Sequence, residues 1–176
     1  PSFALNENTT AIGTVSASDI DGDAITFEVF FNCTTAATED LQINQDGIIS
    51  FVNAPDYEAK SLYQGCVQIN DGTYFVQQEI SININNVNDN TPAITSSTSF
   101  TVNENQTGIG TLTATDADGD VVTFSTTSSE INIDPSSGSL TFVSTPDYEA
   151  KSTYSAPIVV SDGIYSSSKN ITVTIY

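Results

Sequence analysis

Oxygen-bearing side chains are concentrated near the middle of this 176-residue chain, in residues 86–92. Asparagine and aspartate fill four of these seven positions. So many short polar side chains are unfavourable inside a strand or helix, but they suit calcium, a hard cation that takes about six to eight oxygen ligands. Pro92 lacks a backbone donor and biases Thr91 towards an extended conformation. The segment is therefore predicted to be a short connector that binds calcium, and the alternative is an ordinary polar linker.

Acidic motifs recur in the same order on both sides of this connector, and they help to decide between a calcium-binding connector and an ordinary polar linker. The recurring pairs are Asn-Glu-Asn at 6–8 and 103–105, Asp-x-Asp-Gly-Asp at 19–23 and 116–120, Pro-Asp-Tyr-Glu-Ala-Lys at 55–60 and 146–151, and Asp-Gly at 71–72 and 162–163. Such internal repetition indicates two copies of one domain. The copies are predicted to span residues 1–88 and 89–176.

The charge of the chain is strongly negative, at −19, from 22 acidic against 3 basic residues. Phosphate binding needs Lys and Arg, so the composition argues against a nucleic-acid partner or an anionic membrane surface. No apolar run is long enough to cross a bilayer. The carboxylates predicted to surround the connector are Glu7, Asp56, Glu58, Asp89, Asp116, Asp118 and Asp162. Without cations these groups would repel one another.

Alternating apolar and polar residues predict the strands that must position these acids. Ile80, Ile82 and Ile84 alternate with polar residues, and the same pattern recurs at Ile171, Val173 and Ile175. Asp-Gly and Ser-Ser-Gly turn signals separate such runs. The predicted fold is all-β: two tandem Greek-key β-sandwiches of about seven strands each. The first copy is longer, and the extra residues are predicted around 32–39, where the alternation breaks.

The ordered set of motifs resembles two consecutive cadherin repeats over essentially the whole chain. Asn-Glu-Asn, Asp-x-Asp, Asp-Tyr-Glu and the late Asp-Gly are similar to the calcium motifs of that family, and Val-Asn-Asp-Asn-x-Pro at 87–92 is similar to its linker. The resemblance implies that both domains hold calcium at their junction. The implied ligands are Glu7, Asp56, Glu58, Asn86, the Val87 carbonyl, Asn88, Asp89, the Asn90 carbonyl, Asp116, Asp118 and Asp162. Cadherins usually carry Asp where this chain has Asn86, so one negative charge is lost.

Further acids are implied to form half-sites that neighbouring repeats of a longer chain would complete. These are Asp19, Asp21 and Asp71 at one end, and Glu104, Asp147 and Glu149 at the other. Asp23 and Asp120 lie beyond the Asp-x-Asp pair and are either extra ligands or turn formers, of which the turn role is favoured. The chain has no Trp, which excludes the family's exchange of a strand anchored by Trp. Its compact Asp-x-Asp-Gly-Asp turns and scarce basic residues resemble the long secreted adhesins of bacteria.

The predicted function is a calcium-dependent adhesion or extender module at the cell surface or outside the cell. Its predicted partners are adjacent repeats, with a cell-surface protein or glycan as a further possibility. The alternative is a carbohydrate-binding module attached to a polysaccharide-degrading or cell-surface protein. The chain has no His, hence no His-based catalytic triad or general base, and we do not expect an enzyme.

Two cysteines, Cys33 and Cys66, occur in the first copy only. An even count outside the cell favours a disulfide. Alternation, however, points Cys66 outwards and Cys33 nominally inwards. A bridge and two free thiols both remain open on the sequence.

Overall fold

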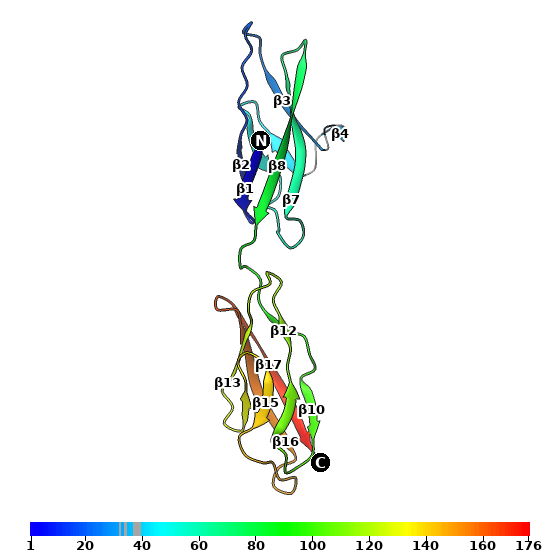
Figure 1. Ribbon diagram of the computed structural model, residues 1–176, viewed down its shortest axis with the longest axis vertical. Helices are drawn as coiled ribbons and strands as arrows, with labels where there is room; N and C mark the ends of the chain where they lie inside the picture. Colours follow the sequence, from blue (N-terminus) through cyan, green and yellow to red (C-terminus); the bar gives the residue numbers. More distant parts are fainter. Residues whose placement is uncertain (32, 34, 37–39) are drawn as a thin grey trace. The chain divides into compact units, whose positions relative to one another are not determined.

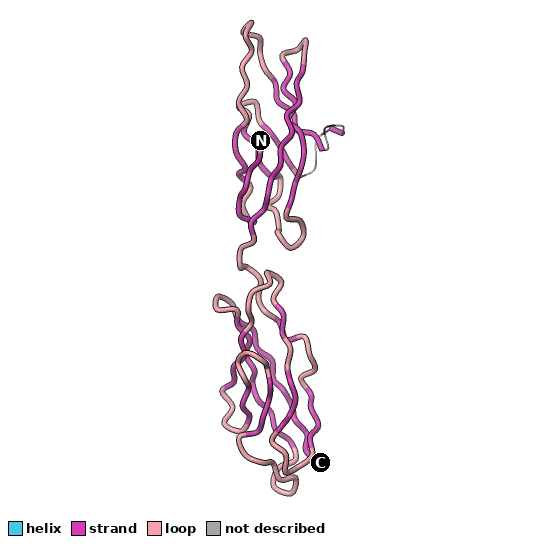
Figure 2. Tube along the Cα trace, in the orientation of Figure 1, coloured by secondary structure: helices cyan, strands magenta, loops and turns pink. Residues whose placement is uncertain are grey.

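The computed structural model describes residues 1–31, 33, 35–36 and 40–176. These residues form β-strands joined by turns and loops, without a helix (Figures 1 and 2), so none of them lies in a helix able to cross a membrane. The chain divides into two compact units, Pro1–Val87 (unit 1) and Asn88–Tyr176 (unit 2). Each unit has its own cluster of buried apolar side chains.

Unit 1 is built from two sheets. Its strands are β1 (Ser2–Asn6), β2 (Ala11–Thr14), β3 (Thr26–Phe31), β4 (Thr35–Ala36), β5 (Leu41–Ile43), β6 (Ile48–Phe51), β7 (Leu62–Asn70) and β8 (Phe75–Asn85). One sheet has the order β1-β8-β7-β3-β4 and the other β2-β6-β5. Strand β1 is parallel to β8, with Leu5 opposite Ile84, whereas β7 and β3 are each antiparallel to their neighbours. The chain therefore passes from one sheet to the other immediately after β1.

The predicted alternation is confirmed in β8. Ile80, Ile82 and Ile84 are buried in the core of unit 1, and Ser81 and Asn83 between them are not. Consecutive side chains on a strand point to opposite faces, so the period-2 pattern fixes which residues enter the core. Burial of these branched side chains removes apolar surface from water and stabilises the sandwich.

Unit 2 repeats this plan with an additional short strand pair. Its strands are β9 (Ala93–Ile94), β10 (Ser99–Val102), β11 (Gly108–Thr111), β12 (Ala114–Thr115), β13 (Thr123–Thr126), β14 (Ile131–Ile133), β15 (Ser139–Phe142), β16 (Thr153–Ser161) and β17 (Ser166–Ile175). The sheets have the orders β10-β17-β16-β13 and β11-β15-β14, and β12 pairs with β9. Ile171, Val173 and Ile175 are buried as predicted, and Ile94 of β9 joins the same core.

A lysine covers the core aromatic residues in each unit. In unit 1 the rings of Phe51 and Tyr63 meet edge to face with centroids 4.8 Å apart, and Lys60 Nζ lies 4.0 Å from the Tyr63 ring centroid. In unit 2, Lys151 lies over Tyr154 in the same way, at 4.4 Å. Such cation–π contacts are favourable. They explain why Lys ends the repeated motif at 55–60 and 146–151.

The two cysteines form a disulfide, Cys33–Cys66, with Cα atoms 5.0 Å apart. Cys66 lies on β7 opposite Phe30 and is fully buried, but it is outside the apolar core cluster of unit 1. The alternation therefore predicted correctly that Cys66 faces away from the apolar core. The disulfide to Cys33 covers the Cys66 side chain instead. Of the extra length predicted at 32–39, the structure describes only Cys33 and β4, and the remainder lies outside the described residues.

Candidate metal-binding residues of each unit

Glu7 joins the end of β8 to the turn that precedes β7 in unit 1. It is 2% exposed. Its Oε1 accepts a hydrogen bond of 2.8 Å from the Val87 N–H, and its Oε2 accepts one of 2.7 Å from the Tyr57 N–H. A buried carboxylate is costly unless it is hydrogen-bonded, and these bonds satisfy one site on each oxygen. Each oxygen keeps lone-pair capacity for a further ligand.

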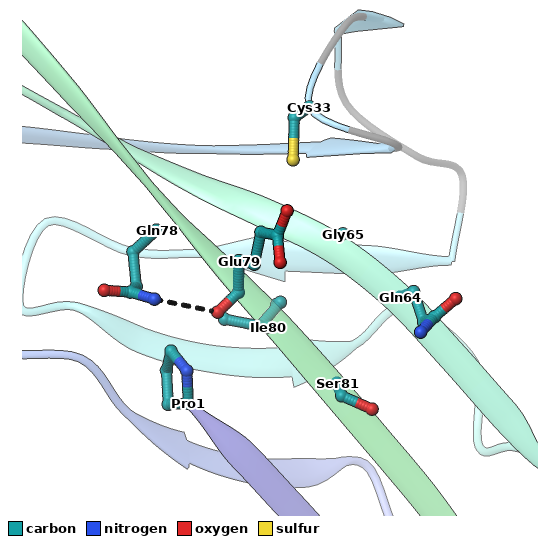
Figure 3. A pocket seen from close by; sticks show the side chains of 8 residues that line it. All are labelled: Pro1, Cys33, Gln64, Gly65, Gln78, Glu79, Ile80 and Ser81. Carbon is teal, nitrogen blue, oxygen red and sulfur yellow. Dashed lines mark hydrogen bonds between the residues drawn. The ribbon is translucent and has the colours of Figure 1, made fainter.

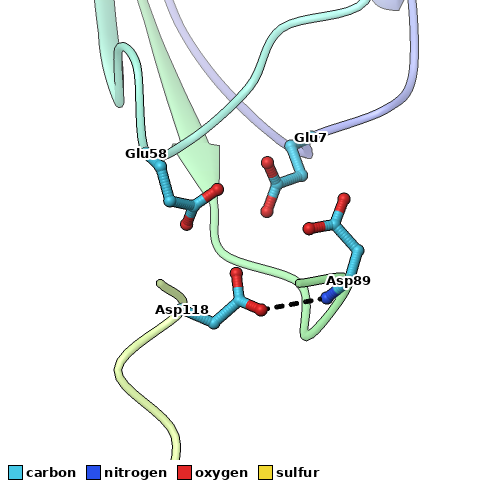
Figure 4. Close-up of side chains that lie close together, drawn as sticks. All are labelled: Glu7, Glu58, Asp89 and Asp118. Atoms are coloured by element: carbon cyan, nitrogen blue, oxygen red, sulfur yellow. Dashed lines mark hydrogen bonds between the residues drawn. The ribbon is translucent and has the colours of Figure 1, made fainter. Parts of the chain in front are cut away.

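Glu58 brings a second carboxylate close to Glu7. Their nearest carboxylate oxygens lie within 4.8 Å of each other, and Figure 4 shows the two side chains, from the end of β1 and from the turn at 55–60. Asn8, at φ 62°, donates to the Pro55 carbonyl at 3.0 Å, which fixes this turn beside Glu7. Asp56 instead caps its own turn, since its Oδ1 accepts from the Ala59 N–H at 3.2 Å.

Asp118 anchors the connector to unit 2. Its Oδ2 accepts from the backbone N–H groups of Asp89 and Asn90, at 3.1 and 2.9 Å, and its Oδ1 accepts from the Asn90 side-chain amide at 3.0 Å. Figure 4 marks the bond from Asp89. Asp116 stands two residues earlier, and its Oδ1 accepts from the Asp118 N–H at 2.9 Å. Hydrogen bonds to a charged acceptor are stronger than neutral ones, so these bonds order the connector and the Asp-x-Asp turn together.

Three buried oxygens of unit 2 have no hydrogen-bond partner among the described residues. They are Asn88 Oδ1, Asp116 Oδ2 and Asp162 Oδ2. Asp162 uses its other oxygen, Oδ1, to accept from the Ile164 and Tyr165 N–H groups, both at 2.7 Å. An unpartnered buried oxygen costs free energy. All three are acceptors from residues predicted as calcium ligands, and a donor set of carboxylate and amide oxygens fits a hard cation.

Two predicted ligands belong to the last residues of unit 1. Asn86 is exposed, and the Val87 N–H is the group that donates to Glu7. The connector thus uses its backbone N–H groups on carboxylates of both units: Val87 on Glu7, and Asp89 and Asn90 on Asp118. Calcium takes oxygen ligands, so the predicted ligands of the connector are its carbonyl and side-chain oxygens and not these N–H groups.

Asp120 was interpreted as a turn former, but its carboxylate also approaches two predicted ligands. Oxygens of Asp116, Asp118 and Asp120 lie within 4.8 Å of one another. Gly119, at φ 82°, makes the turn that brings this about, because positive φ is readily adopted by glycine. The signal for it in the sequence is the third Asp of Asp-x-Asp-Gly-Asp.

Among the described residues, the structure brings the acids of one predicted half-site together, the one in unit 2. In unit 2, carboxylate oxygens of Glu104, Asp147 and Glu149 lie within 4.8 Å of one another. In unit 1, Asp19 Oδ1 accepts from the Asp21 and Asp23 N–H groups at 2.8 and 3.1 Å. The backbone N–H groups of Tyr74 and Thr73 lower the pKa of Asp71 by donating to its carboxylate.

A hollow of about 480 Å³ lies on unit 1 beside Cys33 (Figure 3). Its lining residues are Pro1, Cys33, Gln64, Gly65, Gln78, Glu79, Ile80 and Ser81. Among the described residues that line it, Glu79 carries a carboxylate.

No protein-family model matches the chain. Cadherin-3 of Caenorhabditis elegans is 30% identical over 105 residues, which cover 57% of this chain and 3% of that protein. Protocadherin Fat 4 of Mus musculus is 31% identical over 175 residues, which cover 88% of this chain. The chain spans 3% of the length of these curated relatives.

Solved structures give a closer match in three dimensions. Mouse Cadherin-23 EC22-24 superposes with a TM-score of 0.81 at 21% identity, covering 99% of this chain and 63% of that one. Human Protocadherin-24 EC1-2 (form II) gives 0.83 at 18% identity, covering 99% and 93%. The chain consists of cadherin-like repeats. Identities this low establish a likeness of fold, and the predicted all-β tandem of cadherin-like sandwiches is confirmed at that level.

Proposed function

We propose that this cadherin-like tandem is a calcium-dependent adhesion or extender module, in which Ca²⁺ at the junction of the two repeats fixes their relative orientation. One observation carries the proposal: Asn88, Asp116 and Asp162 each have a buried side-chain oxygen with no hydrogen-bond partner among the residues that the structure describes. Calcium binds several oxygens at once and tolerates irregular geometry. It would satisfy all three oxygens and reduce the repulsion among the nearby acids.

Both repeats supply ligands in this proposal. Repeat 1 (predicted as 1–88) and repeat 2 (89–176) contribute Glu7, Asp56, Glu58, Asn86, the Val87 carbonyl, Asn88, Asp89, the Asn90 carbonyl, Asp116, Asp118 and Asp162. Glu7 and Asp118 support this assignment, because each accepts backbone N–H donors from the connector and so sets where its oxygens lie. Asp120 is a further candidate ligand.

If both repeats bind the same calcium ions, their relative orientation becomes fixed. Each unit has its own core, so each should stay folded without calcium. The connector at 86–92 contains only Val87 and Pro92 as apolar residues, too little to fix an angle by packing. When ligands of both units bind the same ions, bending would break coordination bonds. The tandem is therefore expected to change from a hinged pair to a rod, which holds a distal binding domain away from the cell surface.

Calorimetric titration after chelation tests binding, and small-angle scattering tests the mechanism. We expect calcium to stabilise the protein more than magnesium at equal concentration, since magnesium demands a tighter octahedron and retains water. The maximum dimension and its spread should narrow on adding calcium. An unchanged scattering profile in calcium and in chelator would refute the hinge-to-rod mechanism even if calcium binds.

The setting we propose is extracellular or cell-surface, in a larger adhesin of bacterial type, without catalytic activity. The Cys33–Cys66 disulfide supports an oxidising compartment. Neighbouring repeats are the proposed partners, together with a cell-surface protein or glycan. Binding to a glycan panel, with no change of shape on adding calcium, would instead favour the carbohydrate-binding alternative.

A further inference from the structure

Strand β17 of unit 2 carries an Asn-x-Thr motif at Asn170, Ile171 and Thr172. Ile171 is buried in the core, whereas Asn170 and Thr172 on either side of it are exposed. Residues two apart on a strand point to the same face, so the Asn170 amide and the Thr172 hydroxyl are neighbours on the outer face of the sheet. Asn-x-Ser/Thr is the acceptor motif for N-linked glycans in secreted proteins.

The surroundings of Asn170 leave room for a bulky group. Asn170 lies opposite Pro157 of β16, and Ser168 and Thr172 are its neighbours along β17 on the same face. These three side chains are exposed, small and uncharged. Among the described residues, no hydrogen bond or ion pair holds the Asn170 side chain. Its amide nitrogen is therefore available on an open surface.

Unit 1 covers the same place on its own sheet. By the internal repeat, Glu79 and Cys66 are the counterparts of Asn170 and Pro157, and they pair in the same register between β8 and β7. Cys66 is fully buried, and its disulfide brings Cys33 over this face, where Cys33 and Glu79 line one hollow (Figure 3). Unit 2 has no cysteine, so the corresponding face around Asn170 stays open to solvent.

Three further Asn-x-Thr motifs begin at Asn8, Asn32 and Asn105. Asn32 lies outside the described residues. Asn8 and Asn105 both have a φ of 62°, and each donates its backbone N–H to a proline carbonyl. Asparagine adopts this left-handed conformation more readily than most residues, so the backbone accounts for these two asparagines. It does not account for Asn170, because asparagine is unfavourable within a strand.

We propose that Asn170 is an N-glycosylation site, whose donor is an oligosaccharide linked to a lipid diphosphate. The Nδ2 atom of Asn170 attacks the anomeric carbon of the first sugar, and a C–N bond forms. The bond from that carbon to the phosphate oxygen breaks, the lipid diphosphate leaves with the electron pair, and Nδ2 gives one proton to the transferase. Thr172 supplies the hydroxyl of the acceptor motif. The glycan then covers in unit 2 the face that Cys33 covers in unit 1.

Peptide mapping of the whole 176-residue protein, secreted from eukaryotic cells, tests the proposal. Mass spectrometry is done before and after release of N-glycans by an amidase, which converts each glycosylated Asn to Asp. We expect a glycan on Asn170 in most molecules. Asn170→Gln and Thr172→Val should each abolish it, whereas Thr172→Ser, which keeps the hydroxyl, should retain most of it. Thr174→Val is the matched control, since Thr174 is exposed on the same face but lies outside the motif.

The substituted side chains are all exposed, so the variants should fold. An unmodified Asn170, a glycan found only at the other three motifs, or equal losses in Thr172→Val and Thr174→Val would overturn the inference. The inference rests on the extracellular setting proposed above, but not on calcium, because Asn170 is not a predicted ligand. Calcium titration of the same samples therefore separates the two: unmodified Asn170 with intact calcium binding would refute the glycosylation site alone.

Discussion

Replacing Glu7 by alanine should destabilise unit 1 even when no calcium is present. Glu7 accepts two backbone hydrogen bonds, from Val87 and Tyr57, which join the end of β8 to the turn at 55–60. Glu7→Ala leaves both N–H groups without this acceptor, and the loss of a partly buried donor's partner costs about 1–3 kcal/mol. For the two donors together, the gross loss is therefore about 2–6 kcal/mol for unit 1.

One term opposes this loss. The carboxylates of Glu7 and Glu58 approach within 4.8 Å, and removing one of two like charges at that distance near water relieves about 1 kcal/mol. The expected net destabilisation of unit 1 by Glu7→Ala is about 1–5 kcal/mol. Unit 2 should be unaffected, since both lost bonds lie within unit 1.

Glu104→Ala in unit 2 is the matched control. Glu104 is the counterpart of Glu7 in the repeated Asn-Glu-Asn motif, but it is less buried. Its carboxylate accepts one backbone hydrogen bond, from the Tyr148 N–H at 3.0 Å. The Glu104 carboxylate lies near those of Asp147 and Glu149. The free energy lost with the hydrogen bond and the free energy gained by removing this like-charge repulsion should therefore nearly cancel. Urea unfolding in chelator, followed by hydrogen exchange of the core amides of Ile82 and Val173, separates the two units. Equal destabilisation by the two variants, or an unchanged unit 1 in Glu7→Ala, would show that Glu7 does not act through these bonds.

Three further predictions concern the acids and the disulfide. Hydrogen bonds from Ser137 and Ser136 lower the pKa of Asp134 to about 2. The stability that the Asp134 carboxylate gives unit 2 is therefore present above its unfolded pKa of about 4 and is lost as the pH falls through about 2. NMR titration of the carboxyl group should give this lowered pKa, and an ordinary aspartate pKa would contradict the prediction. The variant lacking both Cys33 and Cys66 should lose about 2–4 kcal/mol of unit 1 stability in urea unfolding, with unit 2 unchanged as the internal control. Asp89→Ala should weaken calorimetric calcium binding more than Asp21→Ala, whose half-site lacks connector ligands; indistinguishable titrations would refute the ligand assignment.

The sequence alone determined the repeat, the strands and the inventory of acids. Period-2 alternation is a property of the extended backbone itself, so Ile80, Ile82 and Ile84 could be assigned to a core without knowing what they pack against. The recurrence of the Asp-x-Asp and Asp-Tyr-Glu motifs likewise identified the candidate ligands, because oxygen chemistry is fixed by residue type.

Tertiary structure decided which of those oxygens are already satisfied. Glu7 and Asp118 accept hydrogen bonds from backbone donors, whereas one oxygen each of Asp116 and Asp162 is buried with no partner in the described part of the chain. Motif and spacing do not distinguish these cases, since the donors come from residues distant in the sequence. Asp120 was assigned to a turn for the same reason: its approach to Asp116 depends on how that turn folds.

The same limit applies to the cysteines and to the two cores. Alternation gave the face of Cys66, but only the folded chain shows that Cys33 reaches it. In unit 2, likewise, only the folded chain shows that Ile94 enters the core, because that depends on the pairing of β9 with β12. Residue patterns specify what a strand can bury, and the neighbours brought together by folding decide whether that place is filled.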